Sequence, residues 1–294
     1  MMDRITFLKN SALAVAAVPL LSFMKKPDKI PTPMKKLCTA CGTQFPEDYN
    51  EKLCAICNEE RQYIPVTGQT WTTHEQLLTN HTTQIVQLNE HLYEIVITPR
   101  FAIGQRAFLV VSKNGNILWD CIPLLDQHVI DFINEKGGVQ AIAISHPHYY
   151  SNMNDWAEQF KCPIYIHKKD ELYINEKGSR IKLWEGNEMP LWDDIKIVNI
   201  GGHFAGSSIL LHKNMSEKGT MLSGDTMYLS PNLKHFAIMY SYPNRMPLPI
   251  SEIKRIKKRL EDLEFDAVYG FYSYQNLTKN VKQILNSSIE KYLS

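Results

Sequence analysis

The sequence predicts an α+β protein in which a small four-cysteine metal module precedes a larger domain of strands and helices. Four of the six cysteines fall within residues 38–57. Over residues 70–294, short apolar strands alternate with amphipathic helical segments. Histidine and aspartate residues directly follow several of the apolar runs, and such loop positions commonly form binding sites.

Length and composition bound the classes of protein to consider. The chain has 294 residues, of which 44% are hydrophobic, enough for one large domain or two ordinary ones. Lys and Arg number 32 against 31 Asp and Glu, so nothing in the charge balance demands nucleic acid. No apolar run reaches about 18 residues, so no ordinary transmembrane helix is expected. Cys121 and Cys162 stand in apolar contexts and are expected in the core, and a disulfide scaffold is not favoured at this size.

Residues 1–33 have the layout of an export signal followed by a linker. A short basic start precedes the apolar residues 12–24, and "RITFLKN" resembles a twin-arginine signal with Ile5 in place of the second arginine. "KKPDKIPTPMKK" is typical of an exposed linker. We therefore expect export or membrane tethering. The alternative is a cytoplasmic protein that truly starts at Met34, directly before "KKLCTACGTQF".

Residues 34–66 predict a zinc ribbon. "CTACGTQFPEDYNEKLCAIC" contains two Cys-x2-Cys pairs separated by twelve residues, which lets both pairs meet around one tetrahedral ion. The ligands would be Cys38, Cys41, Cys54 and Cys57. Four thiolates leave no open position, so this zinc is expected to be structural. Two disulfides or a rubredoxin-like iron are the alternatives. The surrounding charges are mixed, so nucleic acid is not expected, whereas docking of a protein partner through the ribbon stays open.

The first half of the domain over residues 70–294 combines a hairpin with alternating helices and strands. "EIVITP", "AFLVVS" and "NILWDCI" predict strands, and residues 113–116 predict a hairpin turn. "LDQHVIDFINEKGG" predicts a helix that begins after Asp126 and ends at Gly137. "VQAIAIS" predicts a buried strand, "NMNDWAEQF" a helix and "CPIYIH" a further strand.

The second half follows the same pattern. "DIKIVNI", "SSILLH", "GTMLSGD" and "DAVYG" predict strands, and a helix is expected at the C-terminus. "ISEIKRIKKRLEDL" predicts an amphipathic helix, and its basic residues are expected on the solvated face. The apolar face would carry Ile250, Ile253, Ile256, Leu260 and Leu263.

Three histidines and an aspartate follow the ends of these strands. His146 and His148 follow one strand, His203 another and Asp225 a third. A His-x-His pair on an extended loop points two imidazoles the same way, and a third histidine completes a face that leaves a metal position open to water. Each histidine alone would be an ordinary structural residue, but their common placement predicts a metal site.

These motifs resemble the metallo-β-lactamase superfamily, which includes glyoxalase II and ribonuclease Z. The similarity covers residues 70–294 and rests on "WD", "SHPHYYS", "GGHFAGS" and "SGDT". It implies an αββα sandwich with the metal at one edge. With "CGTQF" in front and "SYPNRMPLP" before the helix at residues 250–263, the chain is similar to a largely uncharacterised branch that carries an N-terminal zinc ribbon.

The chain departs from the family pattern at the second metal. Tyr150 replaces the aspartate of the His-x-His-x-Asp-His loop, Ser151 replaces the histidine after it, and Phe271 replaces the last histidine. The ligands private to the second metal are thus lost together, whereas the ligands of the first metal remain. The resemblance therefore implies at most one metal ion in this domain, expected to be zinc.

The resulting expectation is a mononuclear zinc hydrolase that acts on an ester, thioester, amide or lactone through zinc-bound hydroxide. Asp225 is expected to bind the metal or accept a proton, and the Tyr150 hydroxyl to polarise a carbonyl or an oxyanion. The alternative is a non-catalytic binding protein with structural zinc. Asp120 would orient a histidine, and Arg245 would bind an anionic group. The residues expected next to the ligands or the substrate are Asp120, Tyr149, Ser151, Arg245 and Phe271.

Overall fold

The computed structural model describes residues 34–294, and the predicted export signal and linker lie outside them. Among the described residues, no helix has the length and apolar character that a membrane span requires.

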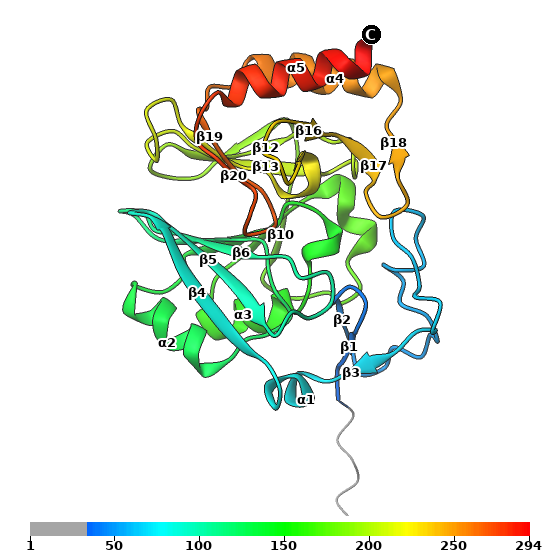
Figure 1. Cartoon of the computed structure of the whole chain (residues 1–294). Coiled ribbons are helices and arrows are strands. Elements are labelled where there is room, and N and C mark those ends of the chain that lie inside the picture. The colour runs from blue at the N-terminus through cyan, green and yellow to red at the C-terminus, as the bar shows by residue number, and fades with distance from the viewer. Residues whose placement is uncertain (1–33) are drawn as a thin grey trace, which may run out of the picture. The chain divides into compact units, whose positions relative to one another are not determined.

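Two facing sheets form the centre of the main domain (Figure 1). The first has the strand order β10-β9-β8-β7-β6-β5-β4, with β7 to β10 parallel and the rest antiparallel. Its strands are β4 Thr82–Asn89, β5 Leu92–Thr98, β6 Ala107–Val110, β7 Ile117–Trp119, β8 Ala141–Ala143, β9 Ile164–His167 and β10 Ile181–Trp184.

The second sheet has the order β11-β12-β13-β14-β19-β20, in which only β14 and β19 are parallel neighbours. Its strands are β11 Glu188–Pro190, β12 Ile195–Asn199, β13 Ser208–His212, β14 Thr220–Leu222, β19 Ala267–Tyr269 and β20 Asn276–Leu277.

Helices cover the outer face of each sheet. Helices α2 Gln127–Glu135 and α3 Met153–Phe160 pack on the first sheet. Helices α4 Ile250–Glu261 and α5 Val281–Leu293 lie on the second sheet, at the top of Figure 1. A separate core fills the space between the sheets, where Trp119 of one meets Leu210 of the other. This arrangement confirms the expected αββα sandwich.

Helix α2 begins where the sequence predicts, and helix α4 buries most of the apolar side chains that the sequence places on its inner face. The side chain of Asp126 accepts a hydrogen bond from the backbone N–H of Val129, which caps the first turn of α2. In α4 the residues Ile253, Ile256 and Leu260 are buried. Ile250, expected on the same face, is 57% exposed because it is the first residue of the helix and the covered stripe begins one turn later.

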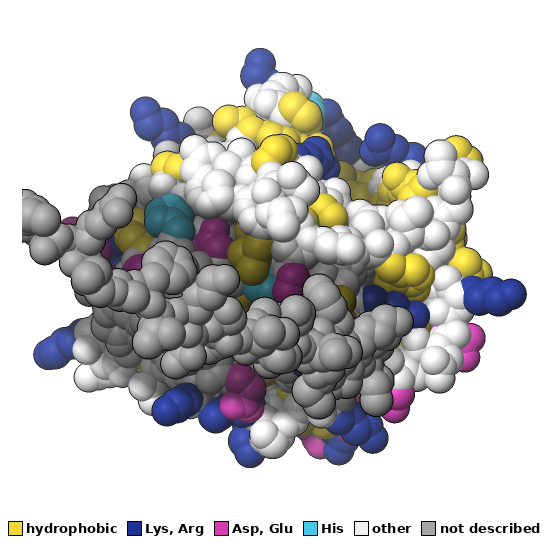
Figure 2. Space-filling view, turned by 90° about the horizontal axis from the view of Figure 1, so that it is seen from below, with side chains coloured by type: hydrophobic (Ala, Val, Ile, Leu, Met, Phe, Trp, Pro, Cys, Tyr) yellow, Lys and Arg dark blue, Asp and Glu magenta, His cyan; other side chains and the backbone are white. Residues whose placement is uncertain are grey.

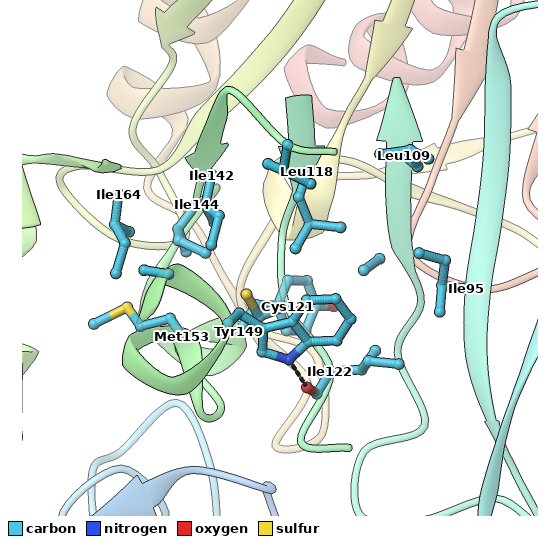
Figure 3. Packing of buried hydrophobic residues seen from close by; sticks show 14 of the residues in the cluster. Ile95, Leu109, Leu118, Cys121, Ile122, Ile142, Ile144, Tyr149, Met153 and Ile164 are labelled. Atoms are coloured by element: carbon cyan, nitrogen blue, oxygen red, sulfur yellow. Dashed lines mark hydrogen bonds between the residues drawn. The ribbon is translucent and has the colours of Figure 1, made fainter. Parts of the chain in front are cut away.

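The core beneath the first sheet extends to the loops that carry the histidines. In Figure 3, Ile142 and Ile144 from β8 and its continuation pack with the loop residues Cys121 and Tyr149. Cys121 and Cys162 are both buried, which confirms their expected place in the core. The loops after β7 and β8 are therefore anchored by apolar side chains on the helix side of the sheet.

The cysteine module packs against this domain as a small three-stranded sheet. Strand β1 Lys36–Cys38 pairs with β2 Gln44–Phe45 and with β3 Trp71–Thr72. The sheet therefore takes in a strand from the segment that the sequence assigned to the main domain. The remaining elements are α1 His74–Leu78, β15 Tyr228–Leu229, β16 Phe236–Ala237, β17 Met239–Ser241 and β18 Met246–Pro247.

Candidate metal centre

The four cysteines of the N-terminal module converge on one point. Their sulfurs lie within 4.8 Å of one another, and all four residues are buried. The sulfurs of Cys41 and Cys54 are 3.6 Å apart and those of Cys38 and Cys57 are 3.7 Å apart, far beyond the roughly 2.05 Å of a disulfide bond. Gly42 turns the chain after the first pair with φ +81°, and a Cβ there would lie 2.8 Å from Pro123. The group has the donors and the shape for one tetrahedral metal ion.

The strand order of the two sheets brings the three histidines and Asp225 together at one edge. The loop of His146 and His148 follows β8, and the loop of His203 follows β12. Asp225 lies in a short 3-10 turn directly after β14. One ligand atom from each residue lies within 4.8 Å of all the others, and all four residues are buried.

Three imidazole nitrogens and one carboxylate oxygen face the centre of this group. Nε2 of His203 lies 3.2 Å from Nδ1 of His148. Oδ2 of Asp225 lies 3.4 Å from Nε2 of His146 and 3.8 Å from Nε2 of His203. Nε2 of His146 is buried without a hydrogen-bond partner, which is costly unless a ligand occupies the centre.

The outward nitrogens of two histidines are fixed by hydrogen bonds. Nδ1 of His203 contacts the carbonyl oxygen of Tyr240 at 2.7 Å, and Nδ1 of His146 contacts the hydroxyl of Ser145 at 2.8 Å. A carbonyl oxygen only accepts, so Nδ1 of His203 carries the proton and its Nε2 presents a lone pair to the centre.

The protonation states of the cluster suit a divalent cation. Burial lowers the pKa of His203 to about 3 and holds that of His148 well below its usual value. Burial would raise the pKa of Asp225, but the neighbouring His146 and His203 outweigh it and the net shift is downward. Neutral His148 and His203 and an ionised Asp225 are in the forms that bind metals, so these three residues fit the ion that the fold implies.

Asp120 lies beneath the histidine loop and supports its backbone. Its Oδ1 accepts a hydrogen bond of 2.7 Å from the backbone N–H of Ser145, the residue before His146. Burial raises the pKa of Asp120 to about 7. Asp120 therefore contacts the backbone of the residue before His146, and its predicted role in orienting a histidine would act through this loop.

The two adjacent tyrosines point to different places. The Tyr149 hydroxyl donates a short hydrogen bond to Oδ1 of Asp225. The Tyr150 hydroxyl instead donates to the carbonyl oxygen of Asp170 at 3.1 Å, inside the core. Ser151 is also turned away, with its hydroxyl 3.3 Å from the carbonyl oxygen of Cys121. The tyrosine that reaches the cluster is therefore Tyr149, and the Tyr150 predicted as catalytic has its hydroxyl engaged elsewhere.

A pocket of about 550 Å³ opens beside Asp225. Phe271 and Arg245 both line it, so the structure places these two predicted residues in the same pocket as Asp225, whereas none of the three histidines lines it. The other aromatic and cationic residues that line it are Tyr63, Arg100, Tyr228, Phe236, Tyr242 and Tyr272. A larger hollow of about 880 Å³ near Lys196 and Asp262 contains none of the candidate site residues.

Comparison with known proteins places the chain in a family. No family model matches the sequence. The uncharacterized protein YmaE of Bacillus subtilis (strain 168) is 40% identical over 259 residues, which cover 87% of this chain and 93% of that protein. The chain belongs to the YmaE family.

Solved structures define the fold of this YmaE-family chain. The DIM-1 metallo-β-lactamase exposed to ceftazidime matches 71% of the chain and 97% of its own length, with a TM-score of 0.54 and 12% identity. VMB-1 matches 72% and 98%, with a TM-score of 0.53 and 14% identity. The main domain therefore has the metallo-β-lactamase fold, which confirms the resemblance drawn from the motifs.

Two residues near the cluster escaped the sequence analysis of this YmaE-family member. Arg61 lies in the segment after the last cysteine, and its Nε donates to the carbonyl oxygen of His203 at 2.5 Å. Tyr240 provides the carbonyl that fixes the His203 ring. Neither residue stands in a motif, so only the three-dimensional arrangement reveals them.

Proposed function

We propose that this protein is a mononuclear zinc-dependent hydrolase that acts on an ester, thioester, amide or lactone. The observation that carries the proposal is the convergence of three histidines and Asp225 within 4.8 Å, beside a pocket. A zinc ion held there would polarise a substrate carbonyl and lower the pKa of water to about neutral. A second zinc ion in the four-cysteine group would be structural, because four thiolates leave no open position.

Asp225 and Tyr149 supply the proton chemistry in this proposal. Asp225 is ionised and lines the pocket, so it can take a proton from the attacking water. The hydroxyl of Tyr149 donates to Oδ1, which leaves Oδ2 on the side of His146 and His203. Tyr149 therefore sets the orientation of the carboxylate.

The pocket favours a substrate with an apolar body and an anionic group. Six Tyr and Phe side chains are among its lining residues, and Arg100 and Arg245 bring two guanidinium groups to it. Replacing Arg245 with Ala should raise the KM for an anionic substrate and leave the KM for a neutral analogue unchanged. An equal effect on both substrates would reject this role for Arg245.

Metal analysis of the full chain is the first test of the proposal. Elemental analysis should find two zinc ions in the wild type and one in His146→Ala/His148→Ala. His91→Ala/His212→Ala is the matched control, because these rings also lie close together, 6.3 Å apart, but outside the cluster. It should retain both ions.

The same proteins are then assayed for hydrolysis of ester, thioester and lactone substrates. Hydrolysis by the wild type that disappears in His146→Ala/His148→Ala supports the proposal. A single zinc ion in both the wild type and this variant would refute it. Two ions without any hydrolysis would favour the alternative, a binding protein with structural zinc.

The location and partners of the protein are a separate proposal. We retain export or membrane tethering through residues 1–33, with a cytoplasmic protein that starts at Met34 as the alternative. On the face shown in Figure 2, Lys and Arg side chains are scattered among acidic and apolar ones. This pattern, in the part of the face that is described, supports a small-molecule substrate over nucleic acid. Mass spectrometry of the native N-terminus would decide between the two locations.

A further inference from the structure

The segment that follows the last cysteine reaches the histidine cluster. Arg61 stands four residues after Cys57, and its side chain is only 13% exposed. Its guanidinium group lies between two rings, 4.4 Å from the centroid of Phe204 and 4.1 Å from that of Tyr240. Its Nε donates to the carbonyl oxygen of His203 at 2.5 Å. A residue of the cysteine module thus binds the backbone of a candidate metal ligand.

The segment around Arg61 is itself fastened to the hairpin formed by β17 and β18. The hydroxyl of Ser241 donates to the carbonyl oxygen of Arg61 at 2.9 Å. The side-chain amide of Asn244 donates to the carbonyl oxygens of Glu60 and Gln62, both at 2.9 Å. These contacts join the segment around Arg61 to the hairpin, so the hairpin and the end of the cysteine module are held against each other.

His203 is consequently held at its ring by Tyr240 and at its backbone by Arg61, two residues that contact each other. Tyr240, whose ring stacks on Arg61, accepts from Nδ1 of His203 through its own carbonyl oxygen. Arg61 binds the backbone carbonyl oxygen of His203. Groups that orient a ligand in this way raise metal affinity because they remove its freedom to turn away.

The cysteine module also contacts the other ligand loop. The backbone N–H of Gln44, in β2, donates to the carbonyl oxygen of Ser151 at 3.0 Å. The side chain of Gln44 donates to Asp155 in α3 at 2.8 Å. The module therefore contacts both loops that carry histidines, and its four cysteines are buried in its own small core.

We infer that Arg61 is a positioning residue that couples the four-cysteine cluster to the histidine cluster. Closing the cysteines around an ion fixes the segment that carries Arg61, and Arg61 in turn holds His203 in its ligating position. Loss of the cysteine-bound ion should then weaken metal binding at the histidines. Coupling of this kind is reciprocal, so metal at the histidines also stabilises the module. The inference rests on the proposed function only in requiring that the histidine cluster binds a metal.

Cobalt(II) titration of the full chain tests the coupling without any substrate. Cobalt bound to thiolates gives intense charge-transfer bands, whereas cobalt bound to histidine and aspartate gives only weak visible bands, so the two clusters are read separately. Arg61→Ala should weaken cobalt binding at the histidines by about tenfold, the lower end of the range for residues that orient a ligand. Arg61→Lys keeps the charge but loses the planar group, and should show most of that loss.

Lys36→Ala is the matched control. Lys36 also stacks on aromatic rings of the module, 4.4 Å from the centroid of Trp71, but it has no contact with His203. The affinity of the Lys36→Ala variant for cobalt at the histidines should equal that of the wild type. Equal affinity in Arg61→Ala, Arg61→Lys and the wild type would overturn the coupling and leave the proposed function standing. No cobalt at the histidines of the wild type would overturn both.

A double-mutant cycle tests whether the effect passes through the cysteine-bound ion. Cys54→Ser/Cys57→Ser removes two of the four thiolates and should lower affinity at the histidines by a similar factor. Adding Arg61→Ala to that protein should then cause little further loss, because Arg61 is already released. Full additivity of the two losses would show that Arg61 acts independently of the cysteine cluster and would overturn the inference.

Discussion

Replacing Asp120 with Asn should change how stability depends on pH. Asp120 is buried, and its backbone has φ +62°, a left-handed conformation that Asn tolerates well. The Asn side chain keeps the oxygen that accepts from the backbone N–H of Ser145. Its amide group can also donate where the protonated acid would, so the substitution mimics the uncharged carboxyl group without altering its shape.

The sign and size of the effect follow from the raised pKa. Burial raises the pKa of Asp120 from 3.8 to about 7. Between these values the unfolded chain has lost the proton that the folded protein still holds, so stability falls as the pH rises. Roughly three pKa units at about 1.4 kcal/mol each give at most about 4 kcal/mol. The Asn variant cannot ionise and does not suffer this loss.

Urea unfolding from pH 4 to pH 8, with the histidine site emptied by a chelator, measures the effect. The free energy of unfolding of Asp120→Asn minus that of the wild type should be small at pH 4 and grow steadily to above pH 7. The charges of His146 and Asp225 act on Asp120, so the difference contains their coupling to this carboxyl group as well as its own titration.

Asp126→Asn provides a control of opposite sign. Burial would raise the pKa of Asp126, but hydrogen bonds from the backbones of Thr83 and Val129 outweigh it and lower the pKa. Asp126 therefore stabilises the protein above the pKa of the unfolded chain, and this contribution is lost as the pH falls. Asp126→Asn should cost stability at neutral pH and less in acid. A pH-independent difference between Asp120→Asn and the wild type would refute the reasoning for Asp120.

Three further substitutions have expected outcomes. Tyr149→Phe removes the donor to Asp225 and should weaken metal binding at the histidines by about tenfold, as measured by cobalt titration. Tyr150→Phe should leave that affinity unchanged and cost only about 1 kcal/mol of stability, since its hydroxyl bonds a core carbonyl; a loss equal to that of Tyr149→Phe would contradict the assignment. Arg106→Met leaves the buried Glu94 unpaired and should cost about 3–5 kcal/mol in urea unfolding, and a loss below 1 kcal/mol would contradict this.

The features that the sequence predicted correctly depend on local spacing or on the ends of strands. The two Cys-x2-Cys pairs fix where four sulfurs can meet, and the structure brings them within 4.8 Å. His146, His203 and Asp225 each follow a buried strand of regular pattern. These strands belong to two facing sheets whose loops meet at one edge of the sandwich, so the order of strands and polar residues indicated the cluster.

The features that the sequence could not predict depend on the direction in which a side chain points or on contacts between residues far apart in the chain. Tyr149 and Tyr150 are adjacent and chemically identical, but the 3-10 turn Pro147–Tyr149 sends the first hydroxyl to Asp225 and the second into the core. No pattern of residue types distinguishes them. The contact of Arg61 with His203 spans 142 positions and depends on how the module packs, which local periodicity does not encode.

The same packing supports the proposal of a single ion in the main domain. Tyr150 and Phe271, which stand where the family resemblance expects two ligands of a second metal, belong to one buried apolar cluster. The ring of Phe271 lies 6.2 Å from that of Tyr149 and 5.7 Å from that of Tyr228. Reintroducing an acid at position 150 would place a charge among apolar side chains, which costs several kcal/mol unless an ion compensates it. Tyr149 already occupies Oδ1 of Asp225, the oxygen turned away from the histidines. This packing supports the proposal of a single ion, and introducing the family's second-site ligands singly should destabilise the fold before it creates a metal site.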